Sequence, residues 1–186
     1  MNDQFSYQLI DSRFGQAALV WRRSSGRPPV VRIFLPRKRA AVLAAIRHAF
    51  PGAQAASSAA TKRLGLKIGR YLEGKPVTFT LAELDMSVCS VFHRQVLTQT
   101  WQIPRGKVVT YGGLADVLGR AGAARAVGMA MARNPFPLII PCHRVVRAGG
   151  ELGGFGGGLP LKKALLEMEG VEFGAAGKVS SRCLTR

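Results

Sequence analysis

The chain contains 186 residues, 47% of them hydrophobic, a composition that suits one large globular domain or two small ones. It has no stretch of about 18 apolar residues, and residues 1–4 are polar, so we expect no membrane span and no secretion signal. The net charge of +17, from 27 Lys and Arg against 10 Asp and Glu, lies far outside the range of an average enzyme.

The positive charge is spread along the whole chain. Residues 1–85 hold 14 basic and 5 acidic side chains, and residues 86–186 hold 13 and 5, so the excess is not a detachable basic tail. Such an excess favours a polyanionic partner, with nucleic acid as the first candidate. The alternative is that an arginine-rich genome or a halotolerant host has raised the charge. Charge alone does not separate DNA from RNA or an acidic membrane.

Cysteines and histidines are few and scattered. There is no CxxC motif and no even pairing, which argues against a disulfide framework and a thiolate zinc site, so we expect neither metal nor cofactor. The residues are Cys89, Cys142 and Cys183, with His48, His93 and His143.

The first 85 residues predict a small α/β domain. Alternating or apolar runs separated by glycine and serine turns predict strands, and 3.6-residue spacing of apolar side chains predicts helices. The expected strands are 5–10, 16–21, 30–35 and a short one at 79–81, and the expected helices are 39–49 and 57–73. No residue pattern in this part indicates chemistry.

The second part reads as mainly helical. Apolar spacing predicts a helix over 88–101, then two shorter helices over 114–118 and 123–133 joined by a turn at Ala121-Gly122. Two short helices with a tight glycine-containing turn are the outline of a helix-turn-helix, although any helical hairpin would fit it. Residues 174–186 begin with a glycine and are expected to form a flexible tail.

The helix over 123–133 has unusually small side chains, with Arg125 among them. Small residues permit close packing in a core. They also permit close approach to a nucleic-acid backbone or a narrow groove, where a long arginine can project into the base stack. The residues on their own leave both readings open.

The segment Pro141-Cys142-His143-Arg144-Val145 carries the strongest chemical signal. A thiol becomes a strong nucleophile as the thiolate, which a neighbouring imidazole favours. The apolar run 138–140 leads into this segment, Asn134-Pro135 stops the helix upstream, and the glycine-rich stretch 149–158 follows. We therefore expect a reactive thiol between rigid elements, beside a loop with little side-chain bulk.

Several elements, in this order, resemble the O6-alkylguanine-DNA alkyltransferase family over about residues 86–171. They are Thr110-Tyr111 with Leu114-Ala115, Ala124 to Gly128, Asn134-Pro135, Ile140 to Val146, Gly157-Gly158-Leu159, Lys162 and Glu169-Gly170. The resemblance implies a ribonuclease-H-like α/β domain over 1–85 and a mainly α catalytic domain with a helix-turn-helix over 86–173. Residues 1–85 themselves resemble the family's first domain only in size and order.

The resemblance also implies the chemistry. Cys142 would take the alkyl group from guanine O6, once per molecule, and His143 would act as its base through a water, oriented by Glu169. Asn134 would brace the turn before the cysteine segment. Tyr111 would crowd the lesion's phosphate and donate a hydrogen bond to the leaving guanine.

The partner implied is double-stranded alkylated DNA, bound through the minor groove by a monomer, without a cofactor, which associates the protein with the nucleoid. Arg125 would fill the gap left by the extruded nucleotide. The other expected DNA contacts are Ala123, Ala124, Ala126, Arg133 and Arg144. The expected base pocket is formed by Val145, Phe155, Gly156 and Gly157. The family commonly has tyrosine at the position of Phe155, which keeps the stacking but removes a hydroxyl.

Three other functions remain to be weighed. A non-catalytic protein that binds the lesion for another repair pathway would not need Cys142. A cysteine hydrolase would need an oxyanion hole and gives no reason for Arg125 or for the charge of +17. A helix-turn-helix regulator should dimerise, and the sequence predicts no dimer seam. Bland roles also exist for single residues, a core tyrosine for Tyr111 and a solvated helix-end acid for Glu169.

Overall fold

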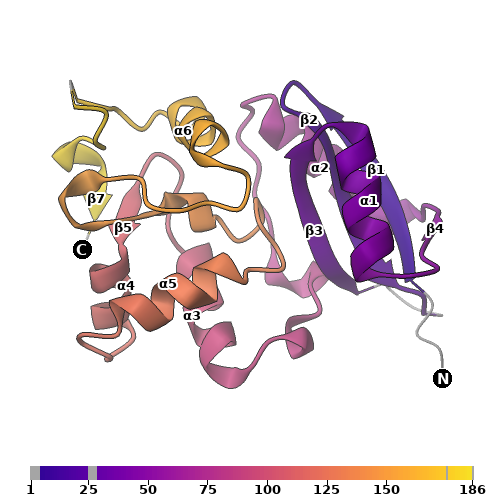
Figure 1. Cartoon of the computed structure of the whole chain (residues 1–186), viewed down its shortest axis with the longest axis horizontal. Coiled ribbons are helices and arrows are strands. Elements are labelled where there is room, and N and C mark those ends of the chain that lie inside the picture. Colours follow the sequence, from indigo (N-terminus) through magenta and orange to yellow (C-terminus); the bar gives the residue numbers. More distant parts are fainter. Residues whose placement is uncertain (1–4, 25–28, 175, 186) are drawn as a thin grey trace. The chain divides into compact units, whose positions relative to one another are not determined.

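The computed structural model describes residues 5–24, 29–174 and 176–185, which form a mixed α/β structure (Figure 1). The chain divides into two compact units: residues 1–88 with 135–139, and residues 89–134 with 140–186. None of the helices described is both long and apolar enough to cross a membrane.

A four-stranded sheet forms the centre of the first unit. β1 (Phe5–Ser12), β2 (Gly15–Arg22) and β3 (Val30–Arg37) form an antiparallel meander, and β4 (Gln54–Ala55) pairs in parallel with β1. The three expected strands are confirmed, each about two residues longer than predicted. The short β4 was not predicted.

Strand alternation gives this sheet two apolar faces, and one helix packs on each (Figure 1). The core beneath α1 (Arg39–Ala49) includes Tyr7 and Leu9 of β1, whereas Gly65 of α2 (Ala59–Leu72) lies against Gln8 and Ile10. α2 begins at Ser58, which forms a reciprocal capping box with its own third helical residue. Both helices were predicted.

The strand predicted at 79–81 is wrong. Residues Leu81–Glu83 form a turn of 3-10 helix, η1, and the ring of Phe79 instead packs edge-on against Tyr71 at 5.8 Å. Alternation over three residues was therefore too short a signal to predict a strand.

The second unit combines helices with a small parallel sheet. The helices are α3 (Val91–Trp101), α4 (Tyr111–Val117), α5 (Ala124–Ala132) and α6 (Leu159–Met168). The strands are β5 (Val108–Thr110), β6 (Val145–Val146) and β7 (Leu184–Thr185), in the order β6-β5-β7. Its 3-10 turns are η3 (Cys142–Arg144), η4 (Ala148–Gly150) and η5 (Ser181–Cys183), whereas η2 (Met86–Val88) belongs to the first unit. The three helices predicted here are present, whereas this sheet was not expected.

The C-terminal segment differs from the flexible tail predicted for 174–186. Within the described residues 176–185, β7 pairs with β5, and Val179 and Cys183 are buried in a core with Val108. Burial of these side chains stabilises the ordered conformation of the segment.

Residues 135–139 lie with the first unit although their neighbours on both sides lie with the second. The amide of Ile33 on β3 donates to the carbonyl of Pro135 at 2.8 Å. Leu138, buried here, has a φ of 75°, in the left-handed region that non-glycine residues rarely adopt. The chain that leads to Cys142 is thus held in a strained conformation by its packing.

Candidate active site

Cys142 is the first residue of η3, the single turn that follows the 135–139 segment. Its side chain is buried, with 8% of the residue exposed, and its amide donates to the carbonyl of Ile140 at 2.8 Å. Burial raises the pKa of the Cys142 thiol, because an apolar environment penalises the thiolate. Hydrogen bonding from Asn134 and the charge of Lys162 act in the opposite direction.

Asn134, just beyond the end of α5, lies directly against this turn. Its amide nitrogen Nδ2 donates to the carbonyl of Ile140 at 3.0 Å, and its side chain also hydrogen-bonds Cys142. One buried amide therefore contacts both the backbone before the thiol and the thiol itself.

His143 and Glu169 form a buried pair beside the thiol. Nε2 of His143 lies 3.2 Å from Oε1 of Glu169, and neither side chain is exposed. Burial lowers the pKa of His143, against the opposite effect of Glu169. The imidazole is therefore neutral at pH 7, with Nε2 as the donor to the carboxylate, which leaves Nδ1 as its basic atom.

Arg144 holds the same carboxylate from the other side. Its Nε donates to Oε2 of Glu169 at 2.8 Å and its Nη2 to Oε1 at 2.6 Å, while Nη1 donates to the carbonyl of Ile103 at 2.5 Å. The sequence placed Arg144 among the DNA contacts. In the structure this guanidinium pairs with Glu169, because a buried carboxylate needs a cation and a bidentate fork supplies one.

Glu169 ends α6 and is buried, not a solvated helix-end acid. Burial alone would raise the pKa of Glu169, but the hydrogen bonds and charges of His143 and Arg144 outweigh it and lower that pKa below its ordinary range. The carboxylate is therefore ionised at every pH at which the protein would work.

Lys162 is the residue of this site to which the sequence reading gave no role. It lies on α6 with none of its surface exposed, and Nζ donates to the carbonyl of Val145 at 2.6 Å and to that of Leu152. Burial lowers the pKa of Lys162 to about 8, and the charge of Cys142 raises it. The sequence contained one signal that Lys162 is buried. It lies three residues before Leu165 and four before Leu166, and therefore on the apolar face of the helix.

Tyr111 begins α4, where Thr110 accepts the cap hydrogen bond from Gly113 at 2.9 Å. Its half-buried ring lies against Gly153, where a Cβ atom would be 3.2 Å from the ring and 3.3 Å from the side chain of Arg147. Burial and the nearby charge of Cys142 raise the pKa of Tyr111, so its hydroxyl stays protonated.

The other predicted pocket residues lie around His143 and the glycine-rich stretch. The ring of Phe155 meets the imidazole of His143 edge-on, with centroids 6.3 Å apart. Val145 is fully buried, Gly157 is half-buried and Gly156 is exposed. The structure thus places the ring of Phe155 against His143. Val145 contacts the site through its backbone, because its amide donates to the carbonyl of Cys142.

The predicted DNA contacts of α5 form a separate, accessible group. Arg125, Ala126 and Arg133 are exposed, and Ala123 and Ala124 are half-buried, while Val127 of the same helix is buried. Gly128 faces Tyr111 of α4, with 3.9 Å between a Cβ at this glycine and the ring. The small residues therefore serve helix packing on one face and leave an open face on the other.

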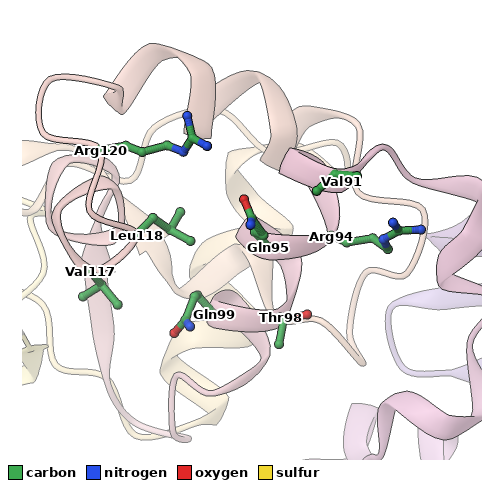
Figure 2. Close-up of a pocket in the computed structure, with 8 residues that line it drawn as sticks. All are labelled: Val91, Arg94, Gln95, Thr98, Gln99, Val117, Leu118 and Arg120. Carbon is green, nitrogen blue, oxygen red and sulfur yellow. The ribbon is translucent and has the colours of Figure 1, made fainter.

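A surface pocket of about 600 Å³ lies between α3 and the C-terminal end of α4 with the residues that follow it. Figure 2 shows Arg120 and Arg94 on opposite sides of it, with Gln95 between them. The guanidinium of Arg120 also lies over the ring of Phe92, 5.3 Å from its centroid. The pocket lining contains two cations and no carboxylate, and none of the predicted site residues. Over the residues that the structure describes, no group of three His, Cys, Asp or Glu could hold a metal ion.

Comparisons with known proteins bear on this arrangement. Residues 91–171 match the family described as 6-O-methylguanine DNA methyltransferase, DNA binding domain. A methylated-DNA–protein-cysteine methyltransferase of Methanothermobacter thermautotrophicus is 49% identical over 113 residues, 60% of this chain and 62% of that protein. The O6-methylguanine methyltransferase structure of Mycobacterium tuberculosis is 32% identical, with a TM-score of 0.71 over 89% of this chain and 93% of that one. The chain belongs to the O6-methylguanine DNA methyltransferase family.

The family match includes the candidate site, because Cys142, His143 and Glu169 lie within residues 91–171. The chain spans about three fifths of the length of the first curated relatives it matches, at 62% and 61%. A Mycobacterium tuberculosis structure solved in complex with DNA is also 32% identical, with a TM-score of 0.71 over 88% of this chain and 92% of that one.

Proposed function

We propose that this protein repairs O6-alkylguanine in duplex DNA by moving the alkyl group irreversibly to its own Cys142. The observation that carries the proposal is the site itself: a buried thiol, held by Asn134 and followed by a histidine that is fixed on an ionised carboxylate. Nucleophile, base and orienting acid are the parts that a thiol-based transfer requires.

In the proposed reaction, Nδ1 of His143 accepts the thiol proton through a water while Glu169 holds Nε2. The Cys142 sulfur then attacks the alkyl carbon in line, so that the S–C bond forms as the bond from carbon to guanine O6 breaks. The protonated hydroxyl of Tyr111 would donate a hydrogen bond to the departing guanine anion, and the proton that His143 took from the thiol would return through water to make the guanine neutral. The thioether is stable, so each molecule would act once.

Access to O6 requires the base to leave the stack, which costs a few kcal/mol. We propose that α4 and α5 form the helix-turn-helix, that the small-residue face of α5 enters the minor groove, and that Arg125 fills the vacated position. The exposed arginines of α5 and the overall charge of +17 support this reading. A relative of the same fold has been solved with DNA.

The finer architecture and setting belong to the same proposal. An antiparallel meander continued by a parallel strand supports a ribonuclease-H-like first unit. We propose that the protein acts as a monomer on double-stranded DNA and, because its substrate is the chromosome, in the cytoplasm at the nucleoid.

A non-catalytic lesion-binding protein is the second candidate function. It would use the same helices and pocket, but it has no need of a thiol, and Cys142 with its hydrogen-bonded partners argues against it.

The test is the intact mass of the protein after incubation with duplex DNA that carries one O6-methylguanine. We expect a gain of one methyl group per protein, saturating at one and absent in Cys142→Ser. Tight binding of the lesion without a mass gain would assign the protein to the non-catalytic class.

A further inference from the structure

We propose that the C-terminal segment, residues 176–185, is a positioning element of the candidate active site. It attaches to two stretches of chain: β5, which runs directly into Tyr111, and η4, which leads into the glycine-rich loop that carries Phe155. The segment lies beyond the family match, which ends at residue 171, so the match assigns it no role. The inference deepens the proposed function and rests on it for the purpose of Tyr111, whereas the contacts of the segment do not depend on it.

The first attachment is to β5. β7 pairs with this strand in parallel, with Val108 opposite Leu184 (Figure 1), and the hydroxyl of Thr185 donates to the carbonyl of Val108 at 3.2 Å. β6, on the other edge of β5, contains only two residues, so much of the pairing that holds β5 comes from β7. Because Thr110 at the end of β5 caps α4, the position of β5 determines the position of Tyr111.

The second attachment is to η4. The amide of Val179 donates to the carbonyl of Gly150 at 2.8 Å, and Lys178 pairs at the surface with Glu151 at 3.6 Å. Gly150 has a φ of 79°, and a Cβ atom at this position would lie 2.6 Å from the carbonyl oxygen of Val179. The two backbones can therefore approach this closely only because residue 150 is glycine.

Apolar burial joins the two attachments. Val179 and Cys183 of the segment are buried in one core with Val108 of β5 and Val146 of β6. Leu152, two residues after η4, packs against the same core. The segment, the two strands and the start of the glycine-rich loop are thus one packed cluster, stabilised by the removal of apolar surface from water.

The two attachments meet at Tyr111. Gly153, three residues after Gly150, lies against this side chain: a Cβ atom at Gly153 would be 3.2 Å from the ring and 3.3 Å from the hydroxyl oxygen. On one side the tyrosine is fixed by α4, whose position depends on β5. On the other side it contacts a loop whose position depends on η4. The C-terminal segment holds both.

The thiol is held by other contacts. Cys142 receives a hydrogen bond from Asn134, and its amide donates to the carbonyl of Ile140. Detachment of the segment should therefore displace Tyr111 and Phe155 while the pKa of the Cys142 thiol keeps its value. A segment that merely stabilised the fold would affect the transfer and the thiol together.

Two neighbouring glycines of η4 provide the test. Gly149→Ala and Gly150→Ala place alanine at φ values of 73° and 79°, so the two variants carry similar backbone strain. A Cβ atom at Gly149 meets nothing within 4 Å, whereas a Cβ atom at Gly150 collides with the carbonyl of Val179. The difference between the variants therefore reports on the attachment of the segment.

Two rates are measured on each variant: benzyl transfer from free O6-benzylguanine to Cys142 in a single turnover, and modification of Cys142 by iodoacetamide as a function of pH. We expect Gly150→Ala to slow benzyl transfer about tenfold or more relative to Gly149→Ala, because a misplacement of about 1 Å can cost about a hundredfold in rate. The midpoint of the iodoacetamide profile should be the same in both variants.

Two results would overturn the proposal. Equal benzyl-transfer rates in the two folded variants would show that the attachment does not position the site. A slower transfer accompanied by a shifted iodoacetamide midpoint in Gly150→Ala would show general damage to the site, which is not a positioning effect.

A second measurement needs neither a variant nor repair activity, so it also covers a Gly150→Ala protein that does not fold. In native-state hydrogen exchange with increasing urea, the amides of residues 179–185 should open in the same cooperative step as those of residues 108–113. A segment that exchanges freely while β5 and Tyr111 stay protected would contradict the attachment. Joint opening in a protein that fails the methyl-transfer test would remove the proposed function and leave the attachment intact.

Discussion

The charged side chains beneath Cys142 are arranged so that each buried charge has a partner. Arg144 forms two hydrogen bonds with the carboxylate of Glu169. Nε2 of His143 forms a further hydrogen bond with the same carboxylate. Removal of one member of such a buried pair costs about 3–5 kcal/mol, because the other charge stays buried without compensation. We therefore predict that Arg144→Met lowers the free energy of unfolding by this amount in urea denaturation at pH 7.

Two variants separate this cause from a general effect of losing an arginine. Arg147→Met removes an exposed guanidinium and should change the free energy of unfolding by no more than about 0.5 kcal/mol. Adding Glu169→Gln to Arg144→Met should restore part of the loss, because the unpaired charge is then gone. A double variant that is less stable than Arg144→Met alone would show that the carboxylate is not the source of the cost.

The sign of the pH dependence follows from the same pair. The pKa of Glu169 is lower in the folded protein than its unfolded value of about 4.3. Its contribution to stability is therefore fully present above that unfolded value and is lost as the pH falls through the folded one.

At the scale of elements, α5 shows a clear difference between a buried face and an exposed face. Val127 and Met131 are buried, while Arg125 and Arg133 are exposed near its two ends. We predict that Arg125→Ala slows methyl transfer from duplex DNA at saturating DNA far more than it slows reaction with free O6-benzylguanine. The reason is that only the duplex substrate leaves a vacancy to be filled. Single-turnover rates on the two substrates measure the difference.

Arg133→Ala is the control on the same helix. It removes the same charge but should weaken DNA affinity while leaving the rate at saturating DNA close to that of the wild type. Equal losses on duplex and free base for Arg125→Ala would contradict the filling role, because a residue that acts only on duplex DNA cannot slow the reaction of the free base.

Elements with a long periodic signal could be predicted from the sequence, and short ones could not. β1 to β3 are alternating or apolar runs in strands of eight residues, and α1 and α2 run for 11 and 14 residues, long enough for the apolar pattern to be recognised. β6 and β7 contain two residues each, and β7 exists because a parallel partner, β5, is available far away in sequence. Nothing in a two-residue segment indicates such a partner.

The same limit applies within the site. The Cys142-His143 pair and Asn134 stand out by type and neighbourhood, and the structure brings these predicted residues together. The sequence did not predict which residues pair with the buried charges, because a basic chain contains many arginines and lysines. Which of them lies at Glu169, or beneath the thiol, depends on how α6 meets η3.

At the scale of the whole molecule, the positive charge exceeds what the site uses. Arg144 and Lys162 have internal partners, whereas most other cations, including those of the pocket beside α3, lie at the surface. The two halves of the chain carry similar excess charge, so the charge count alone does not say which face meets DNA. A side chain that contacts a DNA phosphate releases a counterion on binding. This release distinguishes it from a surface cation that does not contact DNA.

We accordingly predict a steep salt dependence of affinity for undamaged duplex DNA, measured by fluorescence anisotropy. A protein that neutralises about 6–10 phosphates loses roughly 10³–10⁵ in affinity between about 50 and 200 mM salt. Arg133→Ala on α5 should reduce the slope of log affinity against log salt by about one, because one phosphate contact is lost. Arg63→Ala removes the same charge from the exposed side of α2 and should leave the slope unchanged. If the slope is shallow in the wild type, or if both variants change it equally, the cations act as a diffuse field and α5 is not the docking face.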